Sequence, residues 1–216
     1  MAFATCSYIH FDCAVAALWR RTGLAFRRTR GPLVASAVTY LAFVGAGIIL
    51  ASAAVPFAVS QRDAIVEGAA SSSVTQAENR GDHLRAALLD FGSNLFLGAV
   101  PTSVTGLTVV GPFPIAAYRG WVGGVVSIDS HHQSRLAAPG SAVYYVVTLL
   151  LQLAGYILTM AAGVHVGLSA WRARNDQSLR SWAGIRLPKA ALADAGCLYL
   201  LAVPIFLVGS LWEFLA

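Results

Sequence analysis

The stretch from Leu136 to Trp171, LAAPGSAVYYVVTLLLQLAGYILTMAAGVHVGLSAW, contains no aspartate, glutamate, lysine or arginine. About 20 consecutive apolar residues are enough for a helix to cross the hydrocarbon core of a bilayer. Three further stretches, 31–61, 91–118 and 195–212, also lack these charged residues. The sequence therefore predicts an all-α fold, a polytopic transmembrane helical bundle.

The composition agrees with a membrane location. Charged residues make up 12% of the chain, about half of the roughly 25% usual in soluble domains. The net charge of +5 comes almost wholly from arginine, with Lys189 as the one lysine. A basic soluble protein would suggest a nucleic-acid partner, but here the arginines cluster at the ends of apolar runs. Membrane topology explains them better, and we expect membrane lipid rather than nucleic acid as the partner.

About five spans are predicted, at 32–59, 91–110, 114–128, 140–170 and 190–214, as one domain after an N-terminal segment, 1–31. The sequence Gly111-Pro112-Phe113-Pro114 separates the second span from the third, because proline lacks an N–H and clashes with the preceding turn. The third span is short and rich in glycine. It either crosses the bilayer or is partly re-entrant.

Arginine and lysine fix the predicted orientation, because they accumulate on the cytoplasmic side. With the N-terminus inside, the inner segments carry eleven cations and the outer segments four. The inner ones are Arg20, Arg21, Arg27, Arg28, Arg30, Arg119, Arg172, Arg174, Arg180, Arg186 and Lys189; the outer ones are Arg62, Arg80, Arg85 and Arg135. This asymmetry predicts five spans with the C-terminus outside.

The segment 1–31 is predicted to form an amphipathic helix on the inner membrane surface. It combines apolar residues such as Phe11, Leu18 and Trp19 with later arginines. Because these arginines follow the apolar part and Asp12 interrupts it, the segment does not read as a secretory signal.

No catalytic, cofactor or metal motif stands out. The chain has no glycine-rich phosphate loop with a lysine, and its three cysteines lack metal-ligand spacing. Asp129, His131 and His132 form the densest set of metal-type ligands, in a short loop that we interpret as solvated. We therefore predict no enzyme activity, cofactor or metal.

Polar residues inside or at the ends of the spans are the candidate functional residues. Thr148 and Gln152 are four residues apart and share a helix face; they either hydrogen-bond to other helices or line a polar pathway. Arg119 is expected to reach the inner interface or to pair with Asp194. The full set is Asn94, Arg119, Thr148, Gln152, His165, Asp194 and Glu213. For His165 the alternatives are a packing hydrogen bond and proton transfer, and Glu213 is expected near water.

Pairs of glycines four residues apart predict close helix packing, either within one chain or between two in a homodimer. They are Gly120 with Gly124 and Gly163 with Gly167.

From about residue 85 to the end, the chain resembles the stage II sporulation protein M-like family of integral membrane proteins. The similar motifs are Asn94-Leu95, Tyr118-Arg119-Gly120-Trp121-Val122-Gly123-Gly124, Ala161-Ala162-Gly163-Val164-His165-Val166-Gly167, Asp194-Ala195 and Glu213-Phe214. The chain departs from the family where a Pro-His-Gly-x-x-Glu stretch normally begins the fourth span. Those His and Glu positions are Thr148 and Gln152 here, which puts any role that depends on charge or imidazole in doubt.

The resemblance implies a non-catalytic scaffold or accessory subunit in the bacterial cytoplasmic (inner) membrane. Its implied partners are other subunits of an envelope complex: an ATP-driven exporter or cell-wall hydrolases. One alternative is a homodimeric transporter with a pathway lined by Asn94, Thr148 and Gln152. Another is an intramembrane enzyme that uses His165, Gln152 and Asp194.

Overall fold

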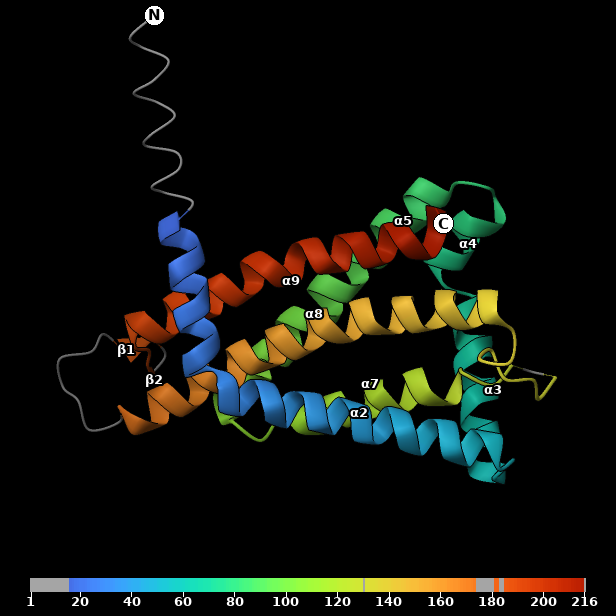
Figure 1. Cartoon of the computed structure of the whole chain (residues 1–216), viewed down its shortest axis with the longest axis horizontal. Coiled ribbons are helices and arrows are strands. Elements are labelled where there is room, and N and C mark those ends of the chain that lie inside the picture. The colour runs from blue at the N-terminus through green and yellow to red at the C-terminus, as the bar shows by residue number, and fades with distance from the viewer. Residues whose placement is uncertain (1–15, 130, 174–180, 183–184, 216) are drawn as a thin grey trace, which may run out of the picture.

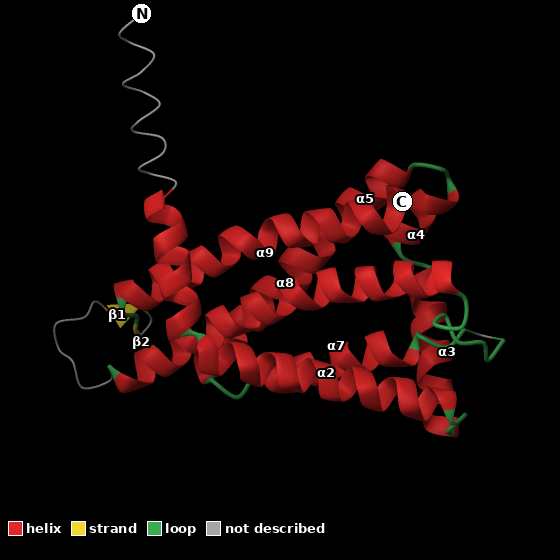
Figure 2. Cartoon of the chain, in the orientation of Figure 1, coloured by secondary structure: helices red, strands yellow, loops and turns green. Residues whose placement is uncertain are grey.

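A computed structural model of the chain describes residues 16–129, 131–173, 181–182 and 185–215. These residues are almost entirely helical, as Figures 1 and 2 show. One short antiparallel pair, β1 (Ser181–Trp182) with β2 (Ile185–Arg186), lies between the last two helices. The prediction of an all-α bundle is confirmed.

Three helices are long and apolar enough to cross a membrane: α2 (Arg30–Ser52), α8 (Pro139–Arg172) and α9 (Lys189–Leu215). The shortest has 23 residues, about 35 Å of helix, against a hydrocarbon core of about 30 Å. These three agree with the predicted spans at 32–59, 140–170 and 190–214, apart from the C-terminal end of the first. The predicted spans at 91–110 and 114–128 do not meet this criterion within the described residues.

The first predicted span ends seven residues too late, because α2 stops at Ser52. Ala54 has a left-handed φ of 53°, and Val55 is extended. The ring of Pro56 disfavours the helical conformation at the residue before it, so a new helix, α3 (Pro56–Ala70), begins there with its proline in the first turn. The apolar residues 53–59 therefore belong to a turn and to a second helix that crosses the end of the bundle (Figure 1).

The segment between the first two predicted spans, residues 60–90, is largely helical. After α3 come α4 (Ser73–Asn79) and α5 (His83–Gly92), whose N-caps Ser72 and Asp82 accept hydrogen bonds from backbone N–H groups. Buried Arg62 fixes α3 to the loop before α8, since its guanidinium donates to the carbonyl of Asp129 at 2.6 Å.

The second predicted span is a helix of changing pitch. From α5 it passes into the π-helix η1 (Ser93–Ala99), then α6 (Val100–Thr105) and the 3₁₀ turn η2 (Gly106–Thr108). Pro101 explains the irregularity, because it has no N–H for the carbonyl four residues earlier. The N–H of Val100 instead bonds the carbonyl of Leu95, five residues back.

A turn around residues 109–111 precedes α7 (Pro112–Val125). The predicted break at Gly111–Pro114 is confirmed, but the helix starts at Pro112 and not at 114. Both prolines lie in the first turn, where a missing N–H leaves no helical bond unmade. With 14 residues, α7 is about 21 Å long, which is short for a full span.

The long segments alternate in direction. In Figure 1, α2, α7 and α9 run from left to right, whereas residues 83–108 and α8 run from right to left. The left end holds the start of α2, the turn before α7, the end of α8 and the start of α9. We call this the arginine end, because Arg28, Arg30, Arg172 and Lys189 lie there.

The N-terminal helix, residues 16–28, joins α2 at Thr29. The side chain of Thr29 is fully buried, and its hydroxyl donates to the carbonyl of Ala25 at 2.7 Å. The helix crosses the arginine end at a steep angle to α9 (Figure 1). Residues 1–15 of the predicted amphipathic segment lie outside the described residues.

Both predicted glycine pairs form contacts within the chain. Gly120 and Gly124 of α7 meet the backbone of α2, where Gly47 faces Gly124. Gly163 and Gly167 of α8 meet the backbone of Ser103, Gly106 and Leu107. A Cβ on Gly163 would lie 2.7 Å from the Cα of Ser103, so only glycine permits this approach. The pairs thus serve the packing of one chain, and a homodimer is not needed to explain them.

Two glycines of α2 provide a matched test of this packing. A Cβ on Gly47 would lie 2.8 Å from the carbonyl oxygen of Trp121, whereas one on Gly45 would meet nothing within 4 Å. We expect Gly47→Ala to lower the free energy of unfolding in mixed SDS and maltoside micelles by about 1–3 kcal/mol through overpacking. Gly45→Ala should be neutral or slightly stabilising, because alanine favours helix. Equal effects of the two substitutions would contradict the backbone contact between α2 and α7.

Candidate functional site

A network of hydrogen-bonded polar side chains connects five helical elements inside the bundle. Arg119 of α7 donates through Nη1 to the hydroxyl of Tyr156 of α8 at 2.5 Å. The same hydroxyl donates to Oδ1 of Asn94 in η1 at 2.6 Å. Asn94 in turn donates to the carboxylate of Asp90 at 2.9 Å, which also accepts from Ser210 of α9 at 2.7 Å. The polar groups therefore tie α5, η1, α7, α8 and α9 together.

Arg119 is partly buried among α7, α8 and η1. Its guanidinium carbon lies 4.2 Å from the centroid of the Tyr156 ring, a cation–π contact. Gly98 of η1 makes room for it, since a Cβ there would lie 2.7 Å from Nη2. The predicted pairing of Arg119 with Asp194 is not found, because Arg119 donates to Tyr156 and Asp194 contacts Arg28 and His165. Arg119 also stands in the middle of α7, so it does not belong to the inner-loop charges.

Gln152 and Glu213 form a second polar pair. The amide Nε2 of Gln152 donates to Oε2 of Glu213 at 2.7 Å and so links α8 to α9. Gln152 therefore bonds to another helix, one of the two alternatives, and it also lines a cavity between α2, α3, α7 and α8. Glu213 is partly exposed, which is compatible with the expected position near water. Thr148 shares the face of Gln152, but its buried hydroxyl has no hydrogen-bond partner among the described residues.

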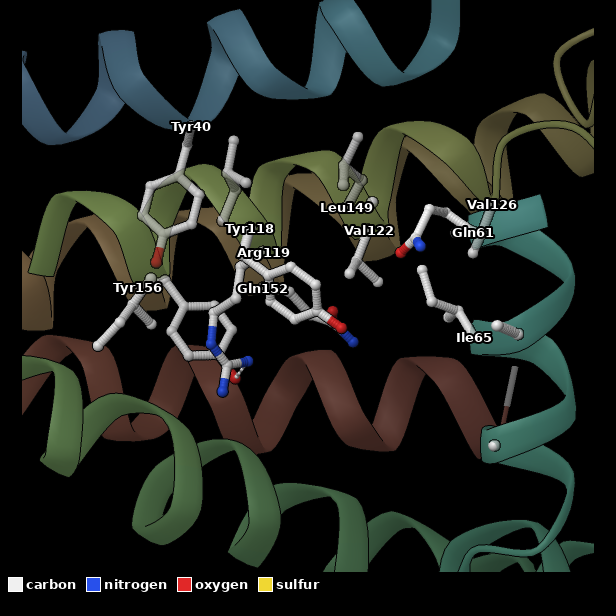
Figure 3. Close-up of a pocket in the computed structure, with 15 residues that line it drawn as sticks. Tyr40, Gln61, Ile65, Tyr118, Arg119, Val122, Val126, Leu149, Gln152 and Tyr156 are labelled. Carbon is white, nitrogen blue, oxygen red and sulfur yellow. Dashed lines mark hydrogen bonds between the residues drawn. The ribbon is translucent and has the colours of Figure 1, made fainter. Parts of the chain in front are cut away.

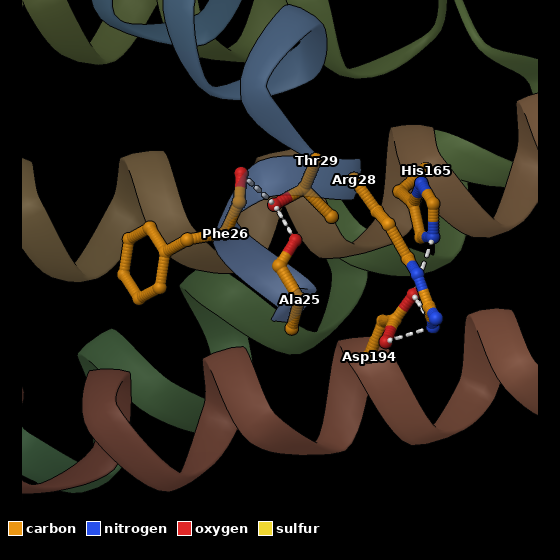
Figure 4. Close-up of polar contacts among 6 residues, drawn as sticks. All are labelled: Ala25, Phe26, Arg28, Thr29, His165 and Asp194. Atoms are coloured by element: carbon orange, nitrogen blue, oxygen red, sulfur yellow. Dashed lines mark hydrogen bonds and ion pairs between the residues drawn. The ribbon is translucent and has the colours of Figure 1, made fainter. Parts of the chain in front are cut away.

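His165 and Asp194 meet at the arginine end of the bundle (Figure 4). Nε2 of His165 lies 3.3 Å from Oδ2 of Asp194, and Nη1 of Arg28 lies 3.3 Å from Oδ1. The side chain of Asp194 is 9% exposed and that of Arg28 is 53% exposed. One carboxylate thus connects the N-terminal helix, α8 and α9, so His165 makes a packing contact whose partner the sequence did not indicate.

The residues that an intramembrane enzyme would use do not converge. His165 and Asp194 lie together, but Gln152 bonds Glu213 elsewhere along α8. His131 and His132 are exposed, and the side chain of Asp129 accepts from the N–H groups of His131 and Gln133. Among the described residues, no group of three or more His, Cys, Asp or Glu side chains could hold a metal ion.

Sequence reasoning missed Asp90, Tyr156 and Ser210, although they complete the interior hydrogen-bond network. Asp90 lies four residues before Asn94, a spacing that puts both on one helix face, and this signal was present in the sequence. Tyr156 and Ser210 had none, because tyrosine and serine are common in apolar helices and only the packing of α8 and α9 shows what they meet.

Comparison with known proteins found no match: no protein-family model, no curated protein and no solved structure matches the chain.

The Tyr156 hydroxyl is the central link of the interior hydrogen-bond network. Tyr118 provides a matched control because it is 58% exposed. Tyr156→Phe leaves Asn94 without a donor and Arg119 without its acceptor, so we expect a loss of about 1–3 kcal/mol in unfolding free energy. Tyr118→Phe should change it by less than about 0.5 kcal/mol. The measurement is unfolding in mixed micelles. A Tyr156→Phe protein as stable as the parent would show that this hydrogen-bond network contributes nothing to the free energy of unfolding.

Proposed function

We propose that the chain crosses a bacterial cytoplasmic membrane five times, with its N-terminus inside and its C-terminus outside. The alternating directions of α2, residues 83–108, α7, α8 and α9 support five crossings. In this proposal the short α7 and the irregular helix before it cross within the protein interior. Neighbouring helices there satisfy backbone groups that lipid could not.

The charges at the two ends support this orientation. Arg20, Arg21, Arg27, Arg28 and Arg30 lie on or beside the N-terminal helix at the arginine end. At the opposite end, α3, α4, the turn before α5 and the loop before α8 carry the acidic residues Asp63, Glu67, Glu78, Asp82 and Asp129 together with arginines. A cytoplasmic arginine end satisfies the positive-inside rule.

The N-terminal helix fits a position in the inner interface. It lies across the bundle axes, and its apolar side chains include Trp19, 65% exposed, and Leu24, 42% exposed. Apolar and arginine side chains on a helix parallel to the membrane are typical of interfacial anchors.

Within this topology, we propose that the protein is a non-catalytic subunit of a larger membrane assembly, a scaffold or an accessory component of an ATP-driven exporter. The observation that carries this proposal is the use of the interior polar groups. Asp90, Asn94, Gln152 and Glu213 all bond to other side chains of the bundle and join its helices. Such groups stabilise one arrangement of helices and leave the apolar outer faces of α2, α8 and α9 for lipid or partner helices. The resemblance to stage II sporulation protein M-like proteins favours the same function.

Single-cysteine labelling tests the topology. In a variant without Cys6, Cys13 and Cys197, a cysteine at Arg80 or Ala216 should react with a membrane-impermeant maleimide in intact cells. One at Arg172 should react only after permeabilisation. Labelling of residue 216 only after permeabilisation would contradict five crossings.

Cross-linking and purification in mild detergent test the function. We expect the tagged protein to retain a specific membrane partner, an ATPase or a wall hydrolase, in stoichiometric amount. A second variant tests one docking face. Val38 and Leu41 are 61% and 55% exposed on α2, and changing both to serine should abolish binding of a partner that docks there. Purification of the protein alone under every condition would contradict the subunit proposal.

A transporter is the second candidate, favoured by the interior polar chain that extends from Ser210 to Arg119. Because the glycine pairs pack within the chain, its pathway would lie inside one bundle and not between two. Solute uptake into proteoliposomes that Asn94→Leu abolishes would favour transport over the subunit role.

A further inference from the structure

A cavity of about 690 Å³ lies between α2, α3, α7 and α8. Figure 3 shows its lining, with α3 at one end and Arg119 and Tyr156 toward the other. Tyr118 lines it and is 58% exposed, so the cavity reaches the surface of the bundle beside α7. Its volume falls in the range of about 300–1,000 Å³ typical of small-molecule sites.

The lining is mostly apolar, with polar side chains around Arg119 and one, Gln61, at the α3 end. Side chains of Ile65, Val122, Val126, Leu149 and Leu153 supply the apolar part. Among the lining residues, Arg119 is the one with a charged side chain. A ligand that matches this lining has an apolar chain and a group that accepts hydrogen bonds from a cation.

Arg119 has unused hydrogen-bonding capacity. A guanidinium carries five N–H donors, and among the described residues only the Tyr156 hydroxyl accepts from it. No described carboxylate lies within 4 Å of it. A cation held in the interior of a bundle without a counter-ion favours an anionic partner.

Tyr40 is an independent sign of a missing partner. Its side chain is fully buried, and its hydroxyl has no hydrogen-bond partner in the described part of the chain. It lines the same cavity, and Figure 3 shows the hydroxyl directed toward Tyr156 and Arg119. Buried hydroxyls are almost always hydrogen-bonded, so an acceptor from a ligand would satisfy it.

We propose that this cavity binds a single-chain amphiphile with an anionic head, a carboxylate or a phosphate ester. The head accepts hydrogen bonds from Arg119 and Tyr40, and the apolar chain lies along Val122, Leu149 and Ile65 toward α3. Two carboxylates lie behind the lining, but Asp90 is bonded to Asn94 and Ser210, and Glu213 to Gln152. Neither lines the cavity, so neither competes with the head for direct contact.

The amphiphile site goes beyond the proposed subunit function and depends on the cavity alone. Loss of binding would leave the five-crossing topology and the membrane partners untouched. A failed partner search or a different topology would not alter binding to the purified protein. The two proposals can therefore fail separately.

The test is equilibrium binding of radiolabelled hexadecanoate to the full-length, delipidated protein in maltoside micelles. Competitors are hexadecyl phosphate, hexadecanol, hexadecylamine and inorganic phosphate. We expect saturable binding of hexadecanoate, displacement by hexadecyl phosphate, and at least tenfold weaker competition by hexadecanol, because a hydrogen bond to a charged group is lost. Arg119→Gln should weaken hexadecanoate binding about tenfold or more, and Arg119→Lys should weaken it less.

Gly68→Phe provides a second variant that leaves Arg119 in place. Gly68 lines the cavity on α3, and a Cβ there meets nothing within 4 Å, so the fold should be unaffected. We expect the phenyl ring to occupy the cavity and reduce binding, while Gly45→Phe on α2, outside the lining, should not.

Several outcomes would overturn the amphiphile site. They are the absence of saturable hexadecanoate binding, equal competition by hexadecanol, and unchanged binding by both Arg119→Gln and Gly68→Phe. Equal competition by inorganic phosphate would also overturn it, because the site would then recognise the anion without its chain.

Discussion

Direct contact between helix backbones is the constraint on which the rest of the bundle depends. Gly47 and Gly124 bring α2 against α7, and Gly163 and Gly106 bring α8 against the irregular helix before α7. Apolar side chains gain little by leaving lipid for one another, so association inside a membrane relies on close packing and interhelical hydrogen bonds. The glycines supply the close packing, and this places the polar side chains within bonding distance.

The interior polar groups follow from that packing. Asn94, Tyr156 and Arg119 come from three segments that are far apart in the sequence, and each would be costly in hydrocarbon without a partner. Their mutual bonds remove most of this cost. The exceptions are informative, because Tyr40 and Arg119 keep unused donors beside a cavity. Where packing leaves donors and space together, a ligand is the simplest way to satisfy them.

The irregular helix from Ser93 to Thr108 connects these features. Pro101 interrupts its hydrogen bonding, and the resulting π-turns place Gly98 against the guanidinium of Arg119. A regular helix would rotate the residues before the proline differently and present another side chain at this point. The irregular backbone before Pro101 and the position of the Arg119 guanidinium therefore depend on each other.

The sequence alone determined the helical class, the three long apolar helices, the break at Gly111–Pro114 and the glycine pairs, because apolar run length, proline and glycine act locally. It misplaced the end of α2, and it offered Arg119 as a partner for Asp194, which instead contacts Arg28 and His165. Those depend on which helix faces which, and residues such as Tyr156 and Ser210 carry no local mark of what they will meet. Only the tertiary structure decided the polar contacts and the cavity, because both arise where segments distant in sequence approach each other.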